Sequence, residues 1–172
     1  DWRLMTADKK ITQAHTPGFN PYYQPVSDLD QSIKSSIVPL ATEEVRKVFF
    51  YGAGVSSEKN QEVIRQAFAV YFPSAVTFVG WDLLAAGRAL CGKEAGIACI
   101  MGTGSNSCLY DGKDIAGNVA NLGWILADEG SGANIGRRFL VDYLRGKQPA
   151  SVASKFAAAY PLTREEFLEK VY

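Results

Sequence analysis

The fold is decided by residues 45–84, which read VRKVFFYGAGVSSEKNQEVIRQAFAVYFPSAVTFVGWDLL. Val45 to Tyr51 is almost continuously apolar or aromatic and predicts a buried strand, and Ala75 to Val79 predicts a second one. Between them, Ser56-Ser57-Glu58 predicts the cap of an amphipathic helix, and a further helix is expected from Asp82 to Leu90. Because strands alternate with helices, this stretch predicts an α/β layer with parallel pairing.

The residues before this layer predict a hairpin, a loop and a helix. Two short β-prone runs, Trp2 to Thr6 and Lys10 to Ala14, are separated by a polar turn and predict antiparallel pairing. The Pro- and Gly-containing segment 16–21 is expected to cross the surface irregularly and to offer side chains to a ligand. A helix is predicted from Ser27 to about Val38, with apolar residues on one face.

The pattern changes from Gly96 onward to short strands and turns, so a second lobe is predicted to begin there. Asp111-Gly112 is a strong hairpin signal, and Thr163 with Glu166 predicts a capping box. The predicted strands are 97–101, 107–110 and 114–119, and the predicted helices are 133–145, 150–159 and one from Thr163.

The whole chain is therefore predicted to be a two-lobed α/β protein, with residues 1–94 in an N-terminal lobe and 95–172 in the start of a C-terminal lobe. The sequence opens in what resembles the middle of a strand and stops within a predicted helix. We expect both lobes to be incomplete.

Charge and composition narrow the classes of partner. Lys plus Arg and Asp plus Glu both total 18, so no single-sign field is available to hold nucleic acid or an anionic membrane. Apolar stretches such as 95–101 are far shorter than the roughly 20 residues of a membrane-spanning helix. We expect a soluble, cytoplasmic protein with small-molecule or protein partners, and leave a homodimer open.

The cysteines and the histidine carry little chemical signal. Cys91, Cys99 and Cys108 lack the paired spacing of a zinc site and are expected to be reduced core thiols. His15 is the only histidine, has no partner in sequence for a triad, and is expected to be structural or solvent-facing.

A candidate phosphate site is Gly102-Thr103-Gly104-Ser105-Asn106-Ser107, which lies between two predicted strands. Its glycines allow backbone N–H groups to turn toward an anion, and its hydroxyls add donors. No Gly-Lys-Ser/Thr follows, so it is not a Walker loop, and it is not a dinucleotide fingerprint because a strand follows. An ordinary hairpin turn is the alternative.

Two acidic positions are candidates for chemistry. Asp82 opens a helix directly after a buried strand, where ligands usually bind in open α/β sheets, and it could accept the proton of an attacking hydroxyl. The alternative is an acid that only complements the helix dipole. Asp128-Glu129-Gly130-Ser131-Gly132 is suited to hydrogen-bonding sugar hydroxyls; helix capping and metal binding are the alternatives.

The run from Leu90 to Gly136, with Met101 to Ser107 and Leu122 to Gly132 inside it, resembles the N-acetylglucosamine kinases of the BadF/BadG/BcrA/BcrD ATPase family. The resemblance covers essentially the whole chain and is closest to kinases of Bacteroides-type bacteria. It implies the actin-like ATPase (ribonuclease H-like) two-lobed fold of the actin, hexokinase and Hsp70 superfamily. It also implies ATP-dependent phosphorylation of N-acetylglucosamine at its 6-hydroxyl, with Mg²⁺ bridging phosphates.

The resemblance also implies roles for individual residues. Asp82 matches the catalytic base, and Gly102, Thr103, Gly104 and Ser105 match the second phosphate loop. Sugar-binding positions are implied for Asn20, Asn106, Gly123 and Asp128, and no residue is assigned to a metal. We expect Asn20, Asp82, Gly104, Asn106 and Asp128 to face one cleft.

Two motifs of the relatives are absent from the given sequence: an Asp-x-Gly-x-Thr phosphate loop before residue 1 and a C-terminal Gly-rich adenosine motif. The 172-residue chain alone is therefore expected to be inactive. Two other functions stay open: a BadF-type ATPase activator of a radical enzyme, which would need cysteines poised at a dimer interface, and a non-catalytic sugar sensor.

Overall fold

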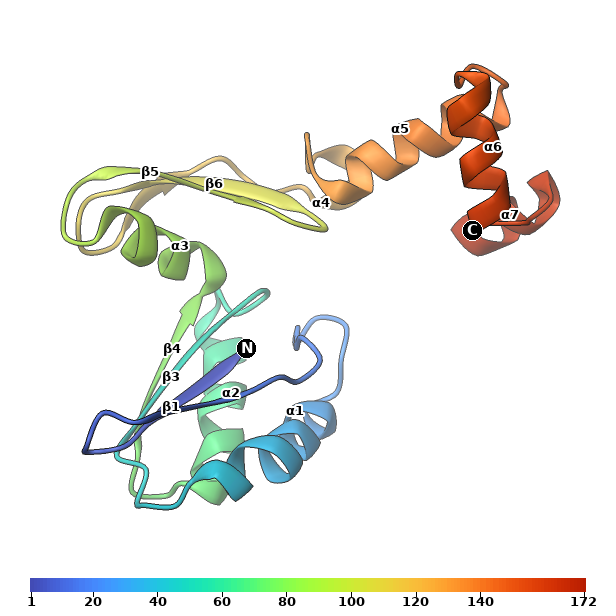
Figure 1. The fold of residues 1–172 in the computed structure, drawn as a ribbon. Helices are drawn as coiled ribbons and strands as arrows, with labels where there is room; N and C mark the ends of the chain where they lie inside the picture. Colours follow the sequence, from blue (N-terminus) through green and yellow to red (C-terminus); the bar gives the residue numbers. More distant parts are fainter. The chain divides into compact units, whose positions relative to one another are not determined.

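The computed structural model describes residues 1–172 and combines helices with short sheets (Figure 1). The α/β prediction is confirmed at this level. In chain order the elements are β1 (Trp2–Met5), β2 (Ile11–Ala14), α1 (Val26–Ser32), η1 (Ile33–Ile37), η2 (Val38–Leu40), β3 (Lys47–Gly52), α2 (Glu58–Tyr71), β4 (Val76–Trp81), α3 (Asp82–Cys91), β5 (Gly96–Met101), β6 (Ser105–Tyr110), β7 (Ile115–Asn118), α4 (Gly123–Leu126), α5 (Gly132–Leu144), α6 (Ala150–Ala159) and α7 (Arg164–Val171).

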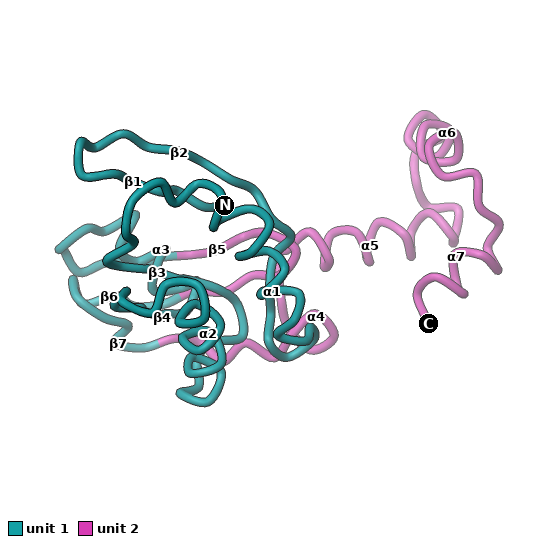
Figure 2. Tube along the Cα trace, turned by 90° about the horizontal axis from the view of Figure 1, so that it is seen from below, with its two compact units in different colours: residues 1–98, 108–117 teal, residues 99–107, 118–172 magenta.

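The chain forms two compact units (Figure 2). The first contains residues 1–98 and 108–117, and the second contains residues 99–107 and 118–172. The boundary passes through the three-stranded sheet β5-β6-β7. The division into lobes 1–94 and 95–172 stays a prediction.

In the first unit, β3 and β4 pair in parallel, with Phe50 opposite Val79. Their inward face packs on α1, η1 and α2 in a core that includes Leu29, Ile33 and Phe68. Trp2 of β1 adds its ring to this core, with centroids 6.0 Å from Phe50 and 5.7 Å from Phe68. Burying large side chains of this kind contributes about 1.5–3 kcal/mol each, so the parallel pair and its helices are held mainly by apolar packing.

The expectation that both strands are buried holds for one face only. Side chains alternate along a strand, and the helices α1 and α2 cover only the face that carries Phe50 and Val79. Phe49 and Val76 on the other face are 60% and 72% exposed. Arg88 from α3 lies over this second face, 5.0 Å from the centroid of the Phe78 ring, and donates to the Tyr51 hydroxyl at 2.7 Å.

The predicted helix 27–38 is not one regular α-helix. The α-helix ends at Ser32, and a π-helical turn and a 3₁₀ turn follow it. Pro39 lies in the last turn, and because proline has no N–H and restricts the residue before it, regular helix cannot continue there. The wider turn still keeps Leu29, Ile33 and Ile37 buried in the core.

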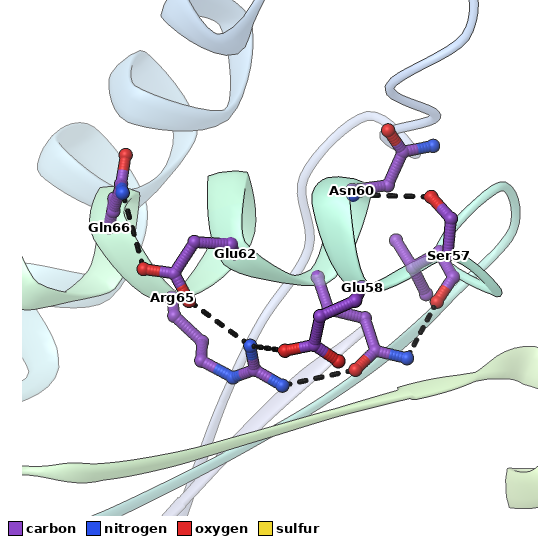
Figure 3. Close-up of polar contacts among 8 residues, drawn as sticks. Ser57, Glu58, Asn60, Glu62, Arg65 and Gln66 are labelled. Carbon is purple, nitrogen blue, oxygen red and sulfur yellow. Dashed lines mark hydrogen bonds and ion pairs between the residues drawn. The ribbon is translucent and has the colours of Figure 1, made fainter.

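Helix α2 begins as the sequence predicts. The Ser57 hydroxyl accepts the Asn60 N–H at 3.3 Å, and Arg65 pairs with Glu58 and Glu62 at 2.7 and 3.1 Å (Figure 3). Exposed ion pairs of this kind contribute little to stability, so the helix is held chiefly by its apolar stripe. The helix also helps to fix the position of Asp82. It packs on β4, and α3 begins with Asp82 directly after that strand.

The downstream segments also follow their local signals. Gly112 has a positive φ of 97° in the turn between β6 and β7, and the capping box at Thr163 and Glu166 is present. Phe156 of α6 stacks on Phe167 of α7 and meets Phe139 and Tyr143 of α5 edge-on. These ring contacts join α5, α6 and α7 of the second unit.

The cysteine prediction holds only in part. Cys108 is buried, Cys91 is half-buried, and Cys99 is exposed. Side chains alternate along β5, so Ala98 takes the inward position and its neighbour Cys99 the outward one. None of the helices has both the length and the hydrophobicity that crossing a membrane would require.

Candidate functional site

The 102–105 loop of the second unit is anchored to the start of α5 through its carbonyl groups. Gly132 N–H donates to Gly102 O at 2.8 Å, and Ala133 N–H donates to Thr103 O at 3.1 Å. The peptide bonds are all trans, so the N–H of each peptide unit points away from its carbonyl. The N–H groups of Thr103 and Gly104 therefore point away from α5 and donate no hydrogen bond within the chain. Two adjacent unpaired donors of this kind suit an anion such as phosphate.

Asp128 links the 102–105 loop to the acidic segment 128–132. Its side chain is buried, and its Oδ1 accepts the Ser105 N–H at 3.0 Å. The Ser105 hydroxyl donates to Glu129 O at 2.9 Å, so the loop is bound to both acidic residues. Asp128 has a φ of 59°, which costs energy for a residue other than glycine and which is typical of positions held for function.

Gly104 lies directly against the Asp128 carboxylate. A Cβ atom at Gly104 would stand 2.9 Å from Asp128 Oδ2, closer than real Cβ contacts allow, and 3.1 Å from Oδ1, which is tighter than most of them. A side chain there would have to displace a buried carboxylate that already accepts a backbone N–H. The glycine is therefore needed for the contact between the loop and the acid.

We expect Gly104→Ala to displace Asp128, and to destabilise the protein by about 1–3 kcal/mol, as overpacking does. The measurement is the melting temperature, which we expect to fall. Gly102→Ala is the matched control for packing, because a Cβ there meets nothing within 4 Å, and we expect it to leave the melting temperature unchanged. Equal behaviour of the two variants would contradict the role of the close contact.

A cavity of about 290 Å³ opens beside this loop in the second unit. This volume is close to the lower end of small-molecule pockets, roughly 300–1,000 Å³. Asp128, Asn106 and Asn121 are among its lining residues, as are the exposed Cys99 and the apolar Ala120. Asn106 Oδ1 accepts the Ser107 N–H at 2.9 Å, while its amide NH₂ makes no hydrogen bond within the chain. The cavity thus offers a carboxylate, an amide donor and an apolar wall to one ligand.

Four of the predicted positions in the second unit lie outside the lining of this cavity. Gly123 begins α4 with a positive φ of 75°. The phosphate-loop residues Gly102 to Gly104 do not line the cavity, whereas their neighbours Met101 and Ser105 do. The sugar-binding role of Gly123 stays a prediction. The short helix α4 was not predicted, because four residues are too few to show a helical period.

Asp82 lies in the first unit at the carboxyl end of β4, as predicted. It is half-buried and borders a cavity of about 440 Å³ together with segment 16–19, with Gly52 at the end of β3 and with Ala53 after it. One carboxylate oxygen accepts the Leu83 N–H at 2.8 Å. The alternative that Asp82 only stabilises the start of its helix is thus partly supported. The second carboxylate oxygen, however, makes no hydrogen bond within the chain and is available to a ligand.

Asn20 is held in a tight turn beside the end of β3. Its Oδ1 accepts the Tyr22 N–H at 3.0 Å, and its N–H donates to the Gln24 side chain at 2.8 Å. Gly54 has a φ of 73° and approaches so closely that a Cβ would stand 2.2 Å from Asn20 Oδ1. The Asn20 amide NH₂ has no partner within the chain, so a donor remains for a ligand.

The candidate residues therefore form two groups. Asn20 and Asp82 belong to the first unit, and Gly104, Asn106 and Asp128 belong to the second. Convergence of both groups on one cleft stays a prediction. No group of three or more His, Cys, Asp or Glu side chains is arranged as a set of metal ligands.

One residue of the second group was missed from the sequence. Asn121 Oδ1 accepts the Gly123 N–H at 2.7 Å, and its Nδ2 donates to Ser105 O at 3.1 Å and to Asp128 Oδ1 at 3.4 Å. An Asn two residues before a glycine is a signal for an Asx turn, and this signal was present in the sequence. Its contacts with Ser105 and Asp128 could not be read from sequence spacing.

Among solved structures, the chain is similar to the crystal structure of a proposed N-acetylglucosamine kinase from Porphyromonas gingivalis. The sequences are 41% identical, the TM-score is 0.82, and the match covers 90% of this chain. The resemblance to the N-acetylglucosamine kinases is confirmed. The chain spans about half of this relative, 56% of its length. No protein-family profile and no curated protein matches the chain.

Proposed function

We propose that the protein is an ATP-dependent sugar kinase that phosphorylates N-acetylglucosamine at its 6-hydroxyl. The observation that carries the proposal is the hydrogen bond between the buried Asp128 carboxylate and the Ser105 N–H, which joins an acceptor for sugar hydroxyls to an anion-binding loop. The similarity to a proposed N-acetylglucosamine kinase supports the choice of sugar. We further propose the actin-like two-lobed fold of the BadF/BadG/BcrA/BcrD ATPases and a cytoplasmic location.

The residues of the two units would divide the work. Asp82 would accept the proton of the attacking sugar hydroxyl through its unpaired oxygen, which borders the cavity at the end of β3. Asp128 would accept hydrogen bonds from other sugar hydroxyls, and Asn20 and Asn106 would donate their amide N–H groups to sugar oxygens. The roles are complementary, because one acid acts on the reacting oxygen and the other holds the ring.

ATP and Mg²⁺ are the implied cofactors. The residues present fit a phosphate group, since the Thr103 and Gly104 N–H groups are unpaired and point away from α5. When bound, Mg²⁺ supplies the positive charge that neutralises the phosphate oxygens during transfer. We assign no residue of this chain to the ion.

The test of the proposal is a coupled ADP-release assay on the full-length protein with a panel of sugars. We expect turnover with N-acetylglucosamine to exceed that with glucose and N-acetylmannosamine, and ³¹P NMR of the product to show coupling to the two C6 protons. ATP hydrolysis that no sugar accelerates would overturn the proposal. A product phosphorylated at the anomeric oxygen would leave a sugar kinase but overturn the 6-hydroxyl assignment.

Cys99 offers a test that does not depend on turnover. The thiol is exposed and lines the same cavity as Asp128, so we expect N-acetylglucosamine to slow its alkylation by iodoacetamide. Peptide mass spectrometry over a time course measures the rate at each cysteine. Cys91 is the internal control, because it is half-buried and does not line that cavity. Equal labelling of Cys99 with and without saturating sugar would contradict sugar binding in this cavity.

A further inference from the structure

Asn121 stands out among the lining residues of the second-unit cavity, because its side-chain Nδ2 lies within hydrogen-bond distance of both the phosphate loop and Asp128. Ser105 has its N–H bound by Asp128 and its carbonyl bound by Asn121. Asn121 Nδ2 is also 3.4 Å from the Asp128 oxygen that accepts the Ser105 N–H. The three residues therefore close a ring of hydrogen bonds between the phosphate loop and the acid.

The other end of Asn121 fixes this ring to the chain. Its Oδ1 accepts the Gly123 N–H at 2.7 Å, which ties the side chain to the start of α4. Gly123 has a positive φ of 75°, a backbone conformation that favours glycine at this turn. The amide is thus held at both ends, and its orientation follows from its partners, one of which is a donor and two of which are acceptors.

The contacts on Asp128 determine which of its oxygens a ligand can use. Oδ1 accepts from Ser105 N–H and lies near Asn121 Nδ2, whereas no donor of the chain bonds to Oδ2. Donors aimed at one oxygen orient the carboxylate plane and leave the second oxygen as the free acceptor. Without Asn121, one of the two constraints on the carboxylate is lost and the Ser105 carbonyl also loses its partner.

We propose that Asn121 is a positioning residue, which orients the Asp128 carboxylate and the Ser105 end of the phosphate loop for the acceptor sugar. This inference rests on the proposed function, because sugar binding by Asp128 is part of that function. The hydrogen bonds among Ser105, Asn121 and Asp128 do not depend on it. Asn121 acts through Asp128 rather than on the reacting atoms. Its effect therefore falls on sugar binding and disappears when Asp128 no longer binds the sugar.

The experiment is a double-mutant cycle on the full-length protein, with N-acetylglucosamine KM and kcat and calorimetric sugar affinity as readouts. We expect Asn121→Ala to raise the sugar KM and Kd roughly 3–10-fold, with kcat nearly unchanged, as loss of one or two hydrogen bonds should. In the Asp128→Asn background, the same substitution should change KM less than twofold, because residues that act together are not additive. Additive effects would overturn the proposal.

Two further variants separate positioning from general structure. Asn118→Ala removes an exposed amide that bonds to a neighbouring carbonyl and does not line the second-unit cavity, so it should leave all readouts unchanged. Asn121→Asp keeps the acceptor for Gly123 N–H but replaces the donor, and we expect it to weaken sugar binding at least as much as Asn121→Ala. If Asn121→Asp binds sugar as tightly as the unaltered protein, the donor has no role and the proposal fails.

Amide hydrogen exchange separates failure of this inference from failure of the proposed function. Asn121→Ala should accelerate exchange at Ser105, which the Asp128 carboxylate otherwise holds, and this needs no ligand. Faster exchange in a protein that binds no sugar would support the positioning role and overturn the proposed function. Unchanged exchange together with unchanged sugar affinity would overturn the positioning role alone.

Discussion

Asp82→Asn should lower kcat by roughly 10²–10⁴-fold while the affinity for N-acetylglucosamine changes little. The substitution keeps the size of the side chain and can keep the hydrogen bond from the Leu83 N–H, so the start of α3 is preserved. It removes the ability to accept the hydroxyl proton, which matters in the transition state more than in the ground state. Steady-state kinetics and calorimetric sugar binding on the full-length protein measure the two effects separately.

Asp28→Asn is the matched control for this prediction. Asp28 is also an acid in the first turn of a helix, α1, but it is exposed and borders none of the described cavities. If Asp82 only complements a helix dipole, the two variants should show similarly small changes in melting temperature and unchanged kcat. Near-normal kcat in Asp82→Asn would remove the basis for assigning Asp82 as the base.

Asp128→Asn should raise the sugar KM roughly 10–10²-fold and change kcat less than Asp82→Asn does. Charge-assisted hydrogen bonds contribute about 1.5–3 kcal/mol each, and the unbonded Oδ2 is the oxygen available to the sugar. The amide oxygen of the variant can still accept the Ser105 N–H, so the loop should keep its anchor. The measurement is KM and kcat, with melting temperature as a check on folding.

Glu129→Gln is the comparison for Asp128→Asn. Glu129 follows Asp128 in sequence and lines the same cavity, but its carboxylate is exposed and accepts no hydrogen bond within the chain. We expect its substitution to leave the sugar KM little changed. If Asp128→Asn abolished kcat while Asp82→Asn did not, the roles of the two acids would be reversed.

The local elements could be predicted because their signals lie within a few residues of one another. Alternating apolar strands and amphipathic helices predicted the parallel β3–β4 pair, Ser57 predicted the cap of α2, and Asp111-Gly112 predicted the β6–β7 turn. The local signals failed where two of them competed. The apolar period of 27–38 predicted one helix, but the α-helix ends at Ser32, a π turn follows it, and Pro39 lies in the 3₁₀ turn after that.

Only part of the candidate site could be predicted from the sequence. Asp82 at the end of a strand and the 102–107 loop could be found because each is a short motif whose backbone geometry is local. The exposure of Cys99 and of Phe49 could not be found, because both lie in apolar runs and burial depends on which face other elements cover. The composition of a strand indicates how apolar the strand is. Which of its two faces is buried depends on the face that the neighbouring elements cover.

The sequence by itself therefore determined the α/β class, the order of the longer strands and helices, and the identity of the two candidate acids, since these follow from local period and motif. Only the tertiary structure decided that Gly104 must lack a side chain, that Asp128 keeps Oδ2 free, and that Asn121 is bonded to both Ser105 and Asp128. These contacts join residues up to 24 positions apart. Their distances depend on how β6 and the segments around α4 and α5 pack, which no local pattern encodes.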